Sequence, residues 1–377
     1  MKTIVINGIS ALLGGGQTNL VNLMRYFVSY DCKVIFLLNS HNMHFFSRYQ
    51  SDQITLVEEH FASRSILHRL SWEKFFLPKK LQEWDADIYY APGGTMITDM
   101  PNACKSITTL QNMLPFDSLE RKRFPFFSYT RFKLFLLKFV FLLSYKKADK
   151  VIFISNYSRD CIKIILPNIE QKSTVIPLGI NEMFMDVNMD AKFDLPSNLK
   201  VNSFYLYVSH LDYYKCHKQV VRNWKKLVDS GFDYPLVLAG PAVNKYGKEV
   251  LELINQLNLN DHVIYLGQVD YEKLPSLYQA ARVLVFASAC ECCPNILLEM
   301  LASRKTILCS DKGPMPEFGE DGVVYFNPHS LEDLCQKAYF IEKNIVESKM
   351  VAERAYELSR KFSHEKTIEK CISYLLN

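Results

Sequence analysis

The chain has 377 residues, of which 49% are hydrophobic and 22% charged, and its formal net charge is +4. The length suits two domains, and the composition of an ordinary globular protein excludes a disordered or low-complexity chain. The modest charge gives no reason to expect nucleic acid as a partner, and the N-terminal MKTIVINGIS lacks the basic-then-apolar order of a signal peptide.

The first half of the chain alternates short apolar runs with segments of helical periodicity. The runs are continuous rather than alternating in polarity, which is typical of parallel strands covered on both faces. A GGG stretch at 14–16 follows the first run, and Leu20, Leu23, Met24 and Phe27 then fall at helical spacing. We expect strands at 3–9, 33–38, 54–57, 87–90, 106–110, 150–155 and 174–177.

Residues 121–150 combine positive charge with aromatic side chains. Nine Lys or Arg stand there against one acid, Asp149, interleaved with Phe, Leu and Tyr. The longest apolar run, 135–143, is interrupted by Lys138 and is too short to span a bilayer. Two interpretations stay open: a packed helix with a solvated basic face, or a patch that rests on an anionic membrane surface.

The alternation stops at 177–203, where Pro177, Gly179 and Pro196 punctuate a polar stretch, and this indicates a linker. It then resumes and ends in a helical pattern at 330–377. The order of elements predicts an α/β protein with two facing Rossmann-like, doubly wound domains. The second set of strands is expected at 204–209, 235–240, 262–267, 282–288, 305–310 and 322–327.

The stretch CECCPNILLEM at 290–300 follows a predicted strand, and doubly wound sheets bind ligands beyond the carboxyl ends of their strands. Pro294 suits the first turn of a helix, whose unpaired amides and dipole would favour an anion. Glu291 and Glu299 bracket that position, and carboxylates bind hydroxyls rather than phosphate. The candidate amides are those of Asn295, Ile296 and Leu297.

A diphosphate between two polyols would satisfy such a site, and a nucleotide sugar has that composition. The competing interpretation is a solvated loop acid at 291 and an ordinary helix-surface charge at 299. Other loops at strand ends add candidates. His210 and Lys215 could both face the diphosphate, Gln268 follows the strand at 262–267, and Gly15 and Gly16 would let the backbone approach a phosphate or sugar.

The ten cysteines are expected to be free. Outside 290–293 they are scattered singly among apolar residues, where Cys behaves as a small hydrophobe. No paired CxxC knuckle occurs in the sequence, which argues against a structural zinc site. This usage indicates a reducing, cytoplasmic compartment.

Several blocks of the sequence resemble, in order, a family 4 glycosyltransferase with the GT-B fold. ECCPNILLE matches that family's motif of two glutamates eight positions apart, and SHLDYYKCHKQVV resembles its phosphate-binding block. The other matching blocks are GGGQTNLVNL, TLQNMLPFD, VIFISNYSRD, VIPLGI, SDKGPMPEFGEDGVVYFNP and the final FSHEKTIEKCISYLL.

The resemblance implies domains at 1–178 and 179–361, a donor site in the cleft between them, and a last helix, 362–377, that crosses back to the first domain. It implies retaining transfer of a hexosyl group from a UDP- or GDP-linked sugar to a growing cell-surface glycan, such as lipopolysaccharide, or a lipid-linked acceptor. No metal or cofactor is expected. Cysteine usage agrees with a cytoplasmic enzyme, and the membrane interpretation of 121–150 would add peripheral contact to the inner membrane.

In this resemblance Lys215 and the amides of 295–297 stabilise the departing diphosphate, Glu291 holds the hexose and Glu299 the ribose. Two positions depart from the family. Its usual Arg is His210 here, and its acceptor-side His is replaced by Gln111 or Asn112. These departures keep an alternative open, a catalytically weakened nucleotide-sugar-binding partner of a glycan assembly complex. An epimerase or phosphorylase is a further alternative, but the pyridoxal-phosphate lysine block of a phosphorylase is not found.

Overall fold

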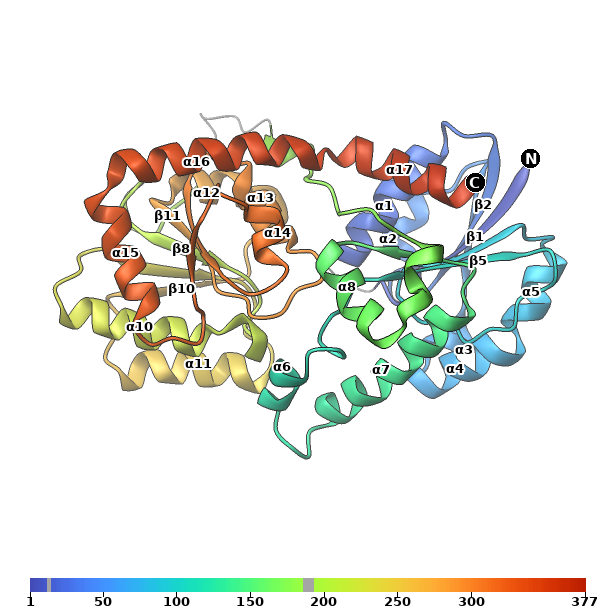
Figure 1. Cartoon of the computed structure of the whole chain (residues 1–377), viewed down its shortest axis with the longest axis horizontal. Helices are drawn as coiled ribbons and strands as arrows, with labels where there is room; N and C mark the ends of the chain where they lie inside the picture. The colour runs from blue at the N-terminus through green and yellow to red at the C-terminus, as the bar shows by residue number, and fades with distance from the viewer. Residues whose placement is uncertain (12–14, 186–192) are drawn as a thin grey trace. The chain divides into compact units, whose positions relative to one another are not determined.

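A computed structural model describes residues 1–11, 15–185 and 193–377, and shows two sheets in which every strand pair is parallel (Figure 1). Gly14 and part of the predicted linker, 186–192, lie outside these ranges. The first sheet has the order β3-β2-β1-β4-β5-β6-β7 and the second β10-β9-β8-β11-β12-β13. The prediction of two Rossmann-like domains is confirmed.

All thirteen predicted strands are present, within one or two residues at most ends. The first sheet contains β1 (Lys2–Asn7), β2 (Cys32–Leu38), β3 (Ile54–Glu58), β4 (Ile88–Ala91), β5 (Lys105–Leu110), β6 (Lys150–Phe153) and β7 (Ser173–Val175). The second contains β8 (Tyr205–Val208), β9 (Leu236–Ala239), β10 (Val263–Gly267), β11 (Val283–Phe286), β12 (Thr306–Ser310) and β13 (Val324–Phe326).

Helices cover both faces of each sheet (Figure 1). Those of the first unit are α1 (Gly15–Phe27), α2 (Met43–Phe46), α3 (His60–Ser63), α4 (Ile66–Phe75), α5 (Leu77–Glu83), α7 (Tyr129–Lys147), α8 (Asn156–Ile165) and α17 (His364–Leu376). Those of the second are α6 (Ser118–Arg123), α9 (Glu182–Met185), α10 (His217–Asp229), α11 (Lys245–Gln256), α12 (Leu274–Ala280), α13 (Asn295–Leu301), α14 (Met315–Gly319), α15 (Asp333–Lys343) and α16 (Ile345–Ser359). In the described ranges, no helix combines the length and apolarity that a bilayer span requires.

Burial explains why the strands are continuous apolar runs. Every residue of β8, β9, β11 and β12 is buried, so neither face of these strands can carry a solvated side chain. In each sheet the chain winds outward on one side and then returns to the other side of its first strand. The winding direction changes between β1 and β4 in one sheet, and between β8 and β11 in the other.

The chain divides into two compact units, and both contain segments that are distant in sequence. One unit comprises 1–116, 127–177 and 365–377, and the other comprises 117–126 and 178–364. Residues 117–126 are predicted to lie in the first domain, whereas in the structure they pack within the second unit.

Polar contacts explain the place of 117–126. Glu120, in α6, is almost wholly buried and accepts a hydrogen bond from Arg123 at 2.9 Å. The Nε2 atom of His329 lies 3.2 Å from the same carboxylate, and Arg123 contacts Nδ1 of His329 at 2.8 Å. The Phe124 ring packs on Tyr213 with a centroid distance of 5.0 Å. Burying a carboxylate is costly unless it keeps its hydrogen-bond and charge partners. Because His329, a partner of Glu120, belongs to the second unit, α6 packs there.

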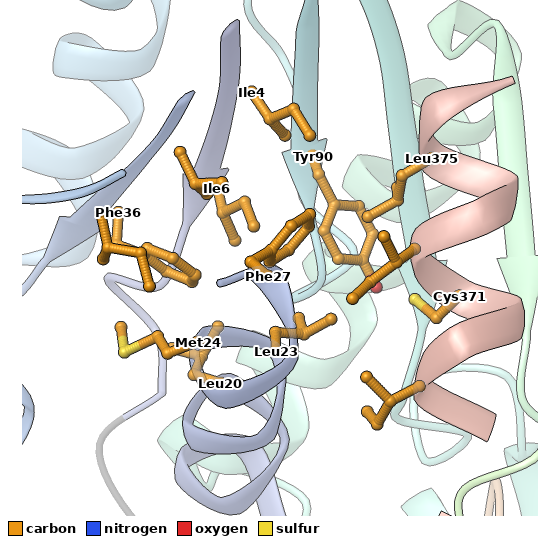
Figure 2. Close-up of a cluster of buried hydrophobic side chains, with 14 of the residues drawn as sticks. Ile4, Ile6, Leu20, Leu23, Met24, Phe27, Phe36, Tyr90, Cys371 and Leu375 are labelled. Atoms are coloured by element: carbon orange, nitrogen blue, oxygen red, sulfur yellow. The ribbon is translucent and has the colours of Figure 1, made fainter. Parts of the chain in front are cut away.

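The last helix belongs to the core of the first unit. Figure 2 shows Cys371 and Leu375 of α17 facing Phe27 of α1 and Tyr90 of β4. Ile372, on the same face of α17, is fully buried in this cluster. The helix therefore fills apolar space that the first 177 residues leave uncovered.

We predict that Ile372→Ala lowers the stability of the first unit by about 2–5 kcal/mol, because it leaves a cavity in this cluster. Glu369→Ala, an exposed position on the same helix, is the control and should stay within about 0.5 kcal/mol of wild type. Thermal unfolding and hydrogen exchange in β1 and β4 measure both. Equal stability of the two variants would show that α17 is not part of the core.

Candidate functional site

The two loops at the switch point of the second sheet carry the principal candidates. Lys215 ends a 3₁₀ turn, Tyr213–Lys215, that follows β8, and Glu291 lies in the loop between β11 and α13. Since β8 and β11 are parallel neighbours, their carboxyl ends place these loops side by side. The amide of Ala289 donates to the carbonyl of Tyr214 at 2.7 Å and joins the loops.

Lys215 and Glu291 form a buried ion pair. The Lys215 ammonium donates to Oε1 of Glu291, and the two side chains are 5% and 16% exposed. Ser288 Oγ donates to the same oxygen at 2.6 Å. The rings of Tyr214 and Phe286 lie 5.1 Å and 5.5 Å from the ammonium and provide further stabilisation of its charge. The structure thus brings together two residues to which the sequence gives separate roles.

Buried neighbours hold the Lys215 backbone in place. Tyr207 in β8 donates to the Lys215 carbonyl at 2.7 Å, and Cys216 adopts a left-handed conformation with φ 56°. His217 stacks on Tyr207 at 4.6 Å, and its Nε2 lies 3.1 Å from Ser209 Oγ. Burial lowers the pKa of His217 well below its ordinary value, so this imidazole is neutral. The sequence reasoning missed both Tyr207 and His217 as positioning residues, because a Tyr in an apolar strand carries no visible signal.

Glu299 lies on α13 among aromatic hydroxyls. It is 8% exposed and accepts hydrogen bonds from Tyr271 at 2.9 Å and from Tyr278 at 3.4 Å. Burial raises the pKa of Glu299 from 4.5 to about 7, and the two hydroxyls offset only part of that rise. The interpretation of Glu299 as an ordinary helix-surface charge is therefore wrong. Neither tyrosine was predicted, because both precede β11 and approach α13 only in the folded chain.

The start of α13 differs in one detail from the prediction. Pro294 occupies the N-cap rather than the first turn, and the Asn295 amide donates to the Cys293 carbonyl at 3.0 Å. The chain turns back tightly at 293–294, so this amide is not one of the free donors expected at 295–297. Asn295 Oδ1 is buried without a hydrogen-bond partner among the described residues. Ile296 is partly exposed and Leu297 is buried.

His210 follows β8 but does not supply the second cation that the sequence suggests. Its Nε2 lies 3.0 Å from the Tyr214 hydroxyl. Removal from water, with the Lys215 charge as a smaller cause, lowers the pKa of His210 to about 4, although 46% of the side chain is exposed. The imidazole is therefore neutral at physiological pH. Gln268 is exposed beyond β10, two strands away from β8.

The remaining candidates belong to the first unit. Gly15 and Gly16 open α1, which follows the switch-point strand β1. Among the described residues, a Cβ on Gly16 would meet Ala11, at an ordinary contact distance of 3.6 Å, so packing against these residues does not require a glycine there. Gln111 and Asn112 follow β5 and are partly buried, and Asn112 Oδ1 accepts the Leu114 amide at 3.0 Å. The Asn112 side chain thus shapes its own turn.

The cysteines of the 290–293 stretch are buried. Burial raises the pKa values of Cys290 and Cys293 well above their ordinary value, so these thiols are protonated. Thiolates are the form that binds metals and reacts. Over the ranges that the structure describes, no three His, Cys, Asp or Glu side chains are grouped so as to hold a metal ion.

Comparisons with known proteins agree with this architecture. A family model described as Glycosyl transferases group 1 matches residues 191–358, and one described as Glycosyltransferase Family 4 matches 13–183. A curated protein of Campylobacter jejuni, N-acetylgalactosamine-N,N'-diacetylbacillosaminyl-diphospho-undecaprenol 4-alpha-N-acetylgalactosaminyltransferase, is 29% identical over 189 residues, which are 49% of this chain and 48% of that protein. The chain spans about half the length of the curated relatives it matches.

Solved structures are similar over the whole chain. A glycosyltransferase from Rickettsia africae has a TM-score of 0.73 at 18% identity, covering 99% of this chain and 97% of its own. Anabaena Alr3699/HepE in complex with UDP-glucose has a TM-score of 0.72 at 17% identity, covering all of both chains. At these identities the likeness concerns the fold, which is GT-B. The two family matches, one in each half of the chain, are together typical of family 4, group 1 glycosyltransferases.

Proposed function

We propose that the protein transfers a hexosyl group from a UDP- or GDP-linked sugar to a glycan or lipid-linked acceptor in cell-surface polysaccharide synthesis, with retention of configuration and without a metal or cofactor. The observation that carries the proposal is the Lys215–Glu291 pair at the switch point of the second sheet, with Glu299 on α13, the helix that follows β11. Family membership agrees with a transferase, and the name of the Campylobacter relative supports a lipid-linked acceptor. The UDP-glucose complex of a protein with the same fold supports a nucleotide-sugar donor.

In this proposal the donor's diphosphate replaces part of the Lys215–Glu291 contact. The ammonium turns to the phosphate oxygens, and Glu291, still held by Ser288, faces the hexose hydroxyls and the positive anomeric carbon. The bond from that carbon to the diphosphate oxygen breaks, and the acceptor oxygen attacks on the same face. The acceptor's proton leaves with the diphosphate. Lys215 stabilises the charge that develops on the leaving group, which is the dominant contribution in reactions of this kind.

Glu299, on α13, would bind the ribose. Its carboxylate already accepts two tyrosine hydroxyls, so it lies in a site built for hydroxyl donors. Two ribose hydroxyls would provide the same kind of hydrogen bond. They would also favour the ionised form of a group whose pKa burial has raised.

The neutral state of His210 favours a second candidate function, a nucleotide-sugar-binding protein of weak activity. Because His210 is uncharged, the diphosphate would have to rely on Lys215 as its cation between these two residues. Less stabilisation of the leaving group slows transfer more than it weakens binding, because the charge grows in the transition state. The two candidates therefore differ in turnover rather than in affinity.

A panel of nucleotide sugars tests the main proposal. We expect hydrolysis or transfer with a UDP- or GDP-linked hexose, unchanged by EDTA, and a loss of roughly a hundredfold or more in Glu291→Gln. Cys292→Ser with Cys293→Ser should retain most of the turnover, because both side chains are buried and burial raises the pKa of the Cys293 thiol. Tight donor binding without turnover would favour the weakly active binding protein, whereas loss of activity on chelation would contradict the metal-free mechanism.

UDP affinity should rise with pH in a way that depends on Glu299. If ribose binds the Glu299 carboxylate, UDP should bind roughly tenfold more weakly at about pH 6 than at about pH 8. Below its pKa of about 7, Glu299 of the unliganded protein is mostly protonated and cannot accept the ribose hydrogen bonds in its ionised form. In Glu299→Gln, calorimetry should show that this part of the pH dependence is lost. The UDP affinity should then change with pH only as the ionisation of the diphosphate dictates. Identical pH profiles in both proteins would remove Glu299 from the ribose site.

The same pKa predicts an opposite effect on stability. The pKa of Glu299 is higher in the folded protein than in the unfolded chain, so the folded state binds this proton more tightly. The contribution of Glu299 to the free energy of unfolding therefore falls as pH rises from about 4.5 to about 7. Glu299→Gln should therefore unfold at a higher temperature than wild type at about pH 8 and show a smaller difference at about pH 5. Thermal unfolding thus distinguishes an effect of Glu299 on UDP binding from an effect of Glu299 on stability.

Restoring a permanent cation at 210 should strengthen the phosphate site. We expect His210→Arg to bind UDP roughly tenfold more tightly, because a charge-assisted hydrogen bond contributes on the order of 1.5–3 kcal/mol. His210→Gln is the matched neutral control and should bind as wild type does. If Arg and Gln behave alike by calorimetry, position 210 does not face the diphosphate.

A further inference from the structure

Helix α7 carries apolar side chains on two opposite sides. Its inner side, with Leu134, Phe141 and Tyr145, is buried in the first unit. The outer side is apolar as well, although solvent reaches it. Its members are Phe132, Phe135, Leu136, Phe139 and Leu143, which are 62%, 46%, 46%, 49% and 57% exposed.

The outer residues form one continuous stripe. They are separated by steps of three, one, three and four residues, which return to the same side of a helix. The rings of Phe135 and Phe139 pack edge to face with a centroid distance of 5.1 Å. Phe127 and Tyr129, 95% and 69% exposed, continue the apolar surface at the start of the helix. The interpretation in which only the cations of 121–150 are exposed is therefore wrong.

Cations border the stripe on both sides. By helical spacing, Arg131 and Lys138 lie along one border, and Lys133 and Lys147 along the other. Lys147 pairs with the exposed Asp99 at 2.7 Å, whereas Lys133, nearer the start of the helix, is exposed. The one acid of 121–150, Asp149, accepts hydrogen bonds from the amide and hydroxyl of Ser106 at 2.8 Å and 2.6 Å. The Asp149 carboxylate thus binds strand β5.

We propose that the outer stripe of α7, with Phe127 and Tyr129, docks on an anionic lipid surface. An apolar stripe between two rows of cations has the chemistry of a helix that lies in the membrane interface, where aromatic and aliphatic side chains enter the headgroup region and Lys and Arg remain at the phosphates. The charge selects this occupant, because an apolar partner protein would offer no counter-charge to Lys133 and Lys138. The inference does not depend on the proposed reaction, although an acceptor on a lipid carrier would be presented to the protein at such a surface.

Sedimentation with vesicles tests the docking surface. We expect the full chain to pellet with vesicles of equal parts phosphatidylglycerol and phosphatidylcholine, far less with phosphatidylcholine alone, and less as salt is added. Lys133→Glu with Lys138→Glu should weaken the partition at least roughly 30-fold, since each cation near an anionic leaflet contributes about fivefold. Phe132→Ser with Phe139→Ser should also weaken it, with less dependence on salt.

Matched variants elsewhere on the chain provide the controls. Lys248→Glu with Lys349→Glu makes the same change in net charge at exposed positions of α11 and α16. Val346→Ser with Met350→Ser removes exposed apolar side chains from α16, which are 76% and 59% exposed. Both should pellet as wild type does, and thermal unfolding should show all four variants folded.

Three outcomes would overturn the proposal. The first is that wild type stays in the supernatant at low salt. The second is that the control variants lose binding as much as the α7 variants, which would mean that net charge alone attracts the protein. The third is a dimer in sedimentation velocity that Phe132→Ser with Phe139→Ser abolishes, with no vesicle binding, which would show that a second copy covers the stripe.

Discussion

The parallel pairing of strands buried on both faces is the constraint on which the rest of this structure depends. A parallel sheet needs a crossover after every strand, and the crossovers cover both faces and bring all carboxyl ends to one edge. In the second sheet this edge receives the loops after β8 and β11 as neighbours, although Lys215 and Glu291, which lie in these loops, are 76 positions apart in the chain. Lys215 and Glu291 meet for that reason and not because any local preference directs one toward the other.

The charges of this site are compensated within the protein. The Lys215 ammonium is paired with Glu291, burial raises the pKa of Glu299 to about 7, and His210 is neutral. A buried ion pair is costly to break, so a ligand that separates Lys215 from Glu291 must offer both residues new partners. A diphosphate and a polyol together do so, whereas either alone satisfies one of the two. In the proposed function, this requirement would favour a nucleotide sugar over a free nucleotide or a free sugar.

Two segments show how far the units depart from the order of the chain. Residues 117–126 join the second unit because Glu120 is buried against Arg123 and His329, and α17 joins the first because Ile372 and Leu375 complete its apolar cluster. The reasons differ in kind. A buried carboxylate must be where its partners are, while an apolar helix face can be placed wherever uncovered apolar surface remains. Each segment couples the folding of one unit to a stretch of chain that lies outside its main span.

The sequence by itself determined the thirteen strands, the two doubly wound sheets and the motif around Glu291 and Glu299, because continuous apolar runs and residue spacing are local signals. It could not determine the protonation of His210, the paired amide of Asn295, the tyrosines that contact Glu299 or the exposed stripe of α7. The phenylalanines of α7 show why. Phe132 and Phe141 are the same residue type in one helix, yet one is 62% exposed and the other 3%. Exposure, desolvation and hydrogen-bond partners depend on what packs against a residue from elsewhere in the chain, and only the tertiary structure decides that.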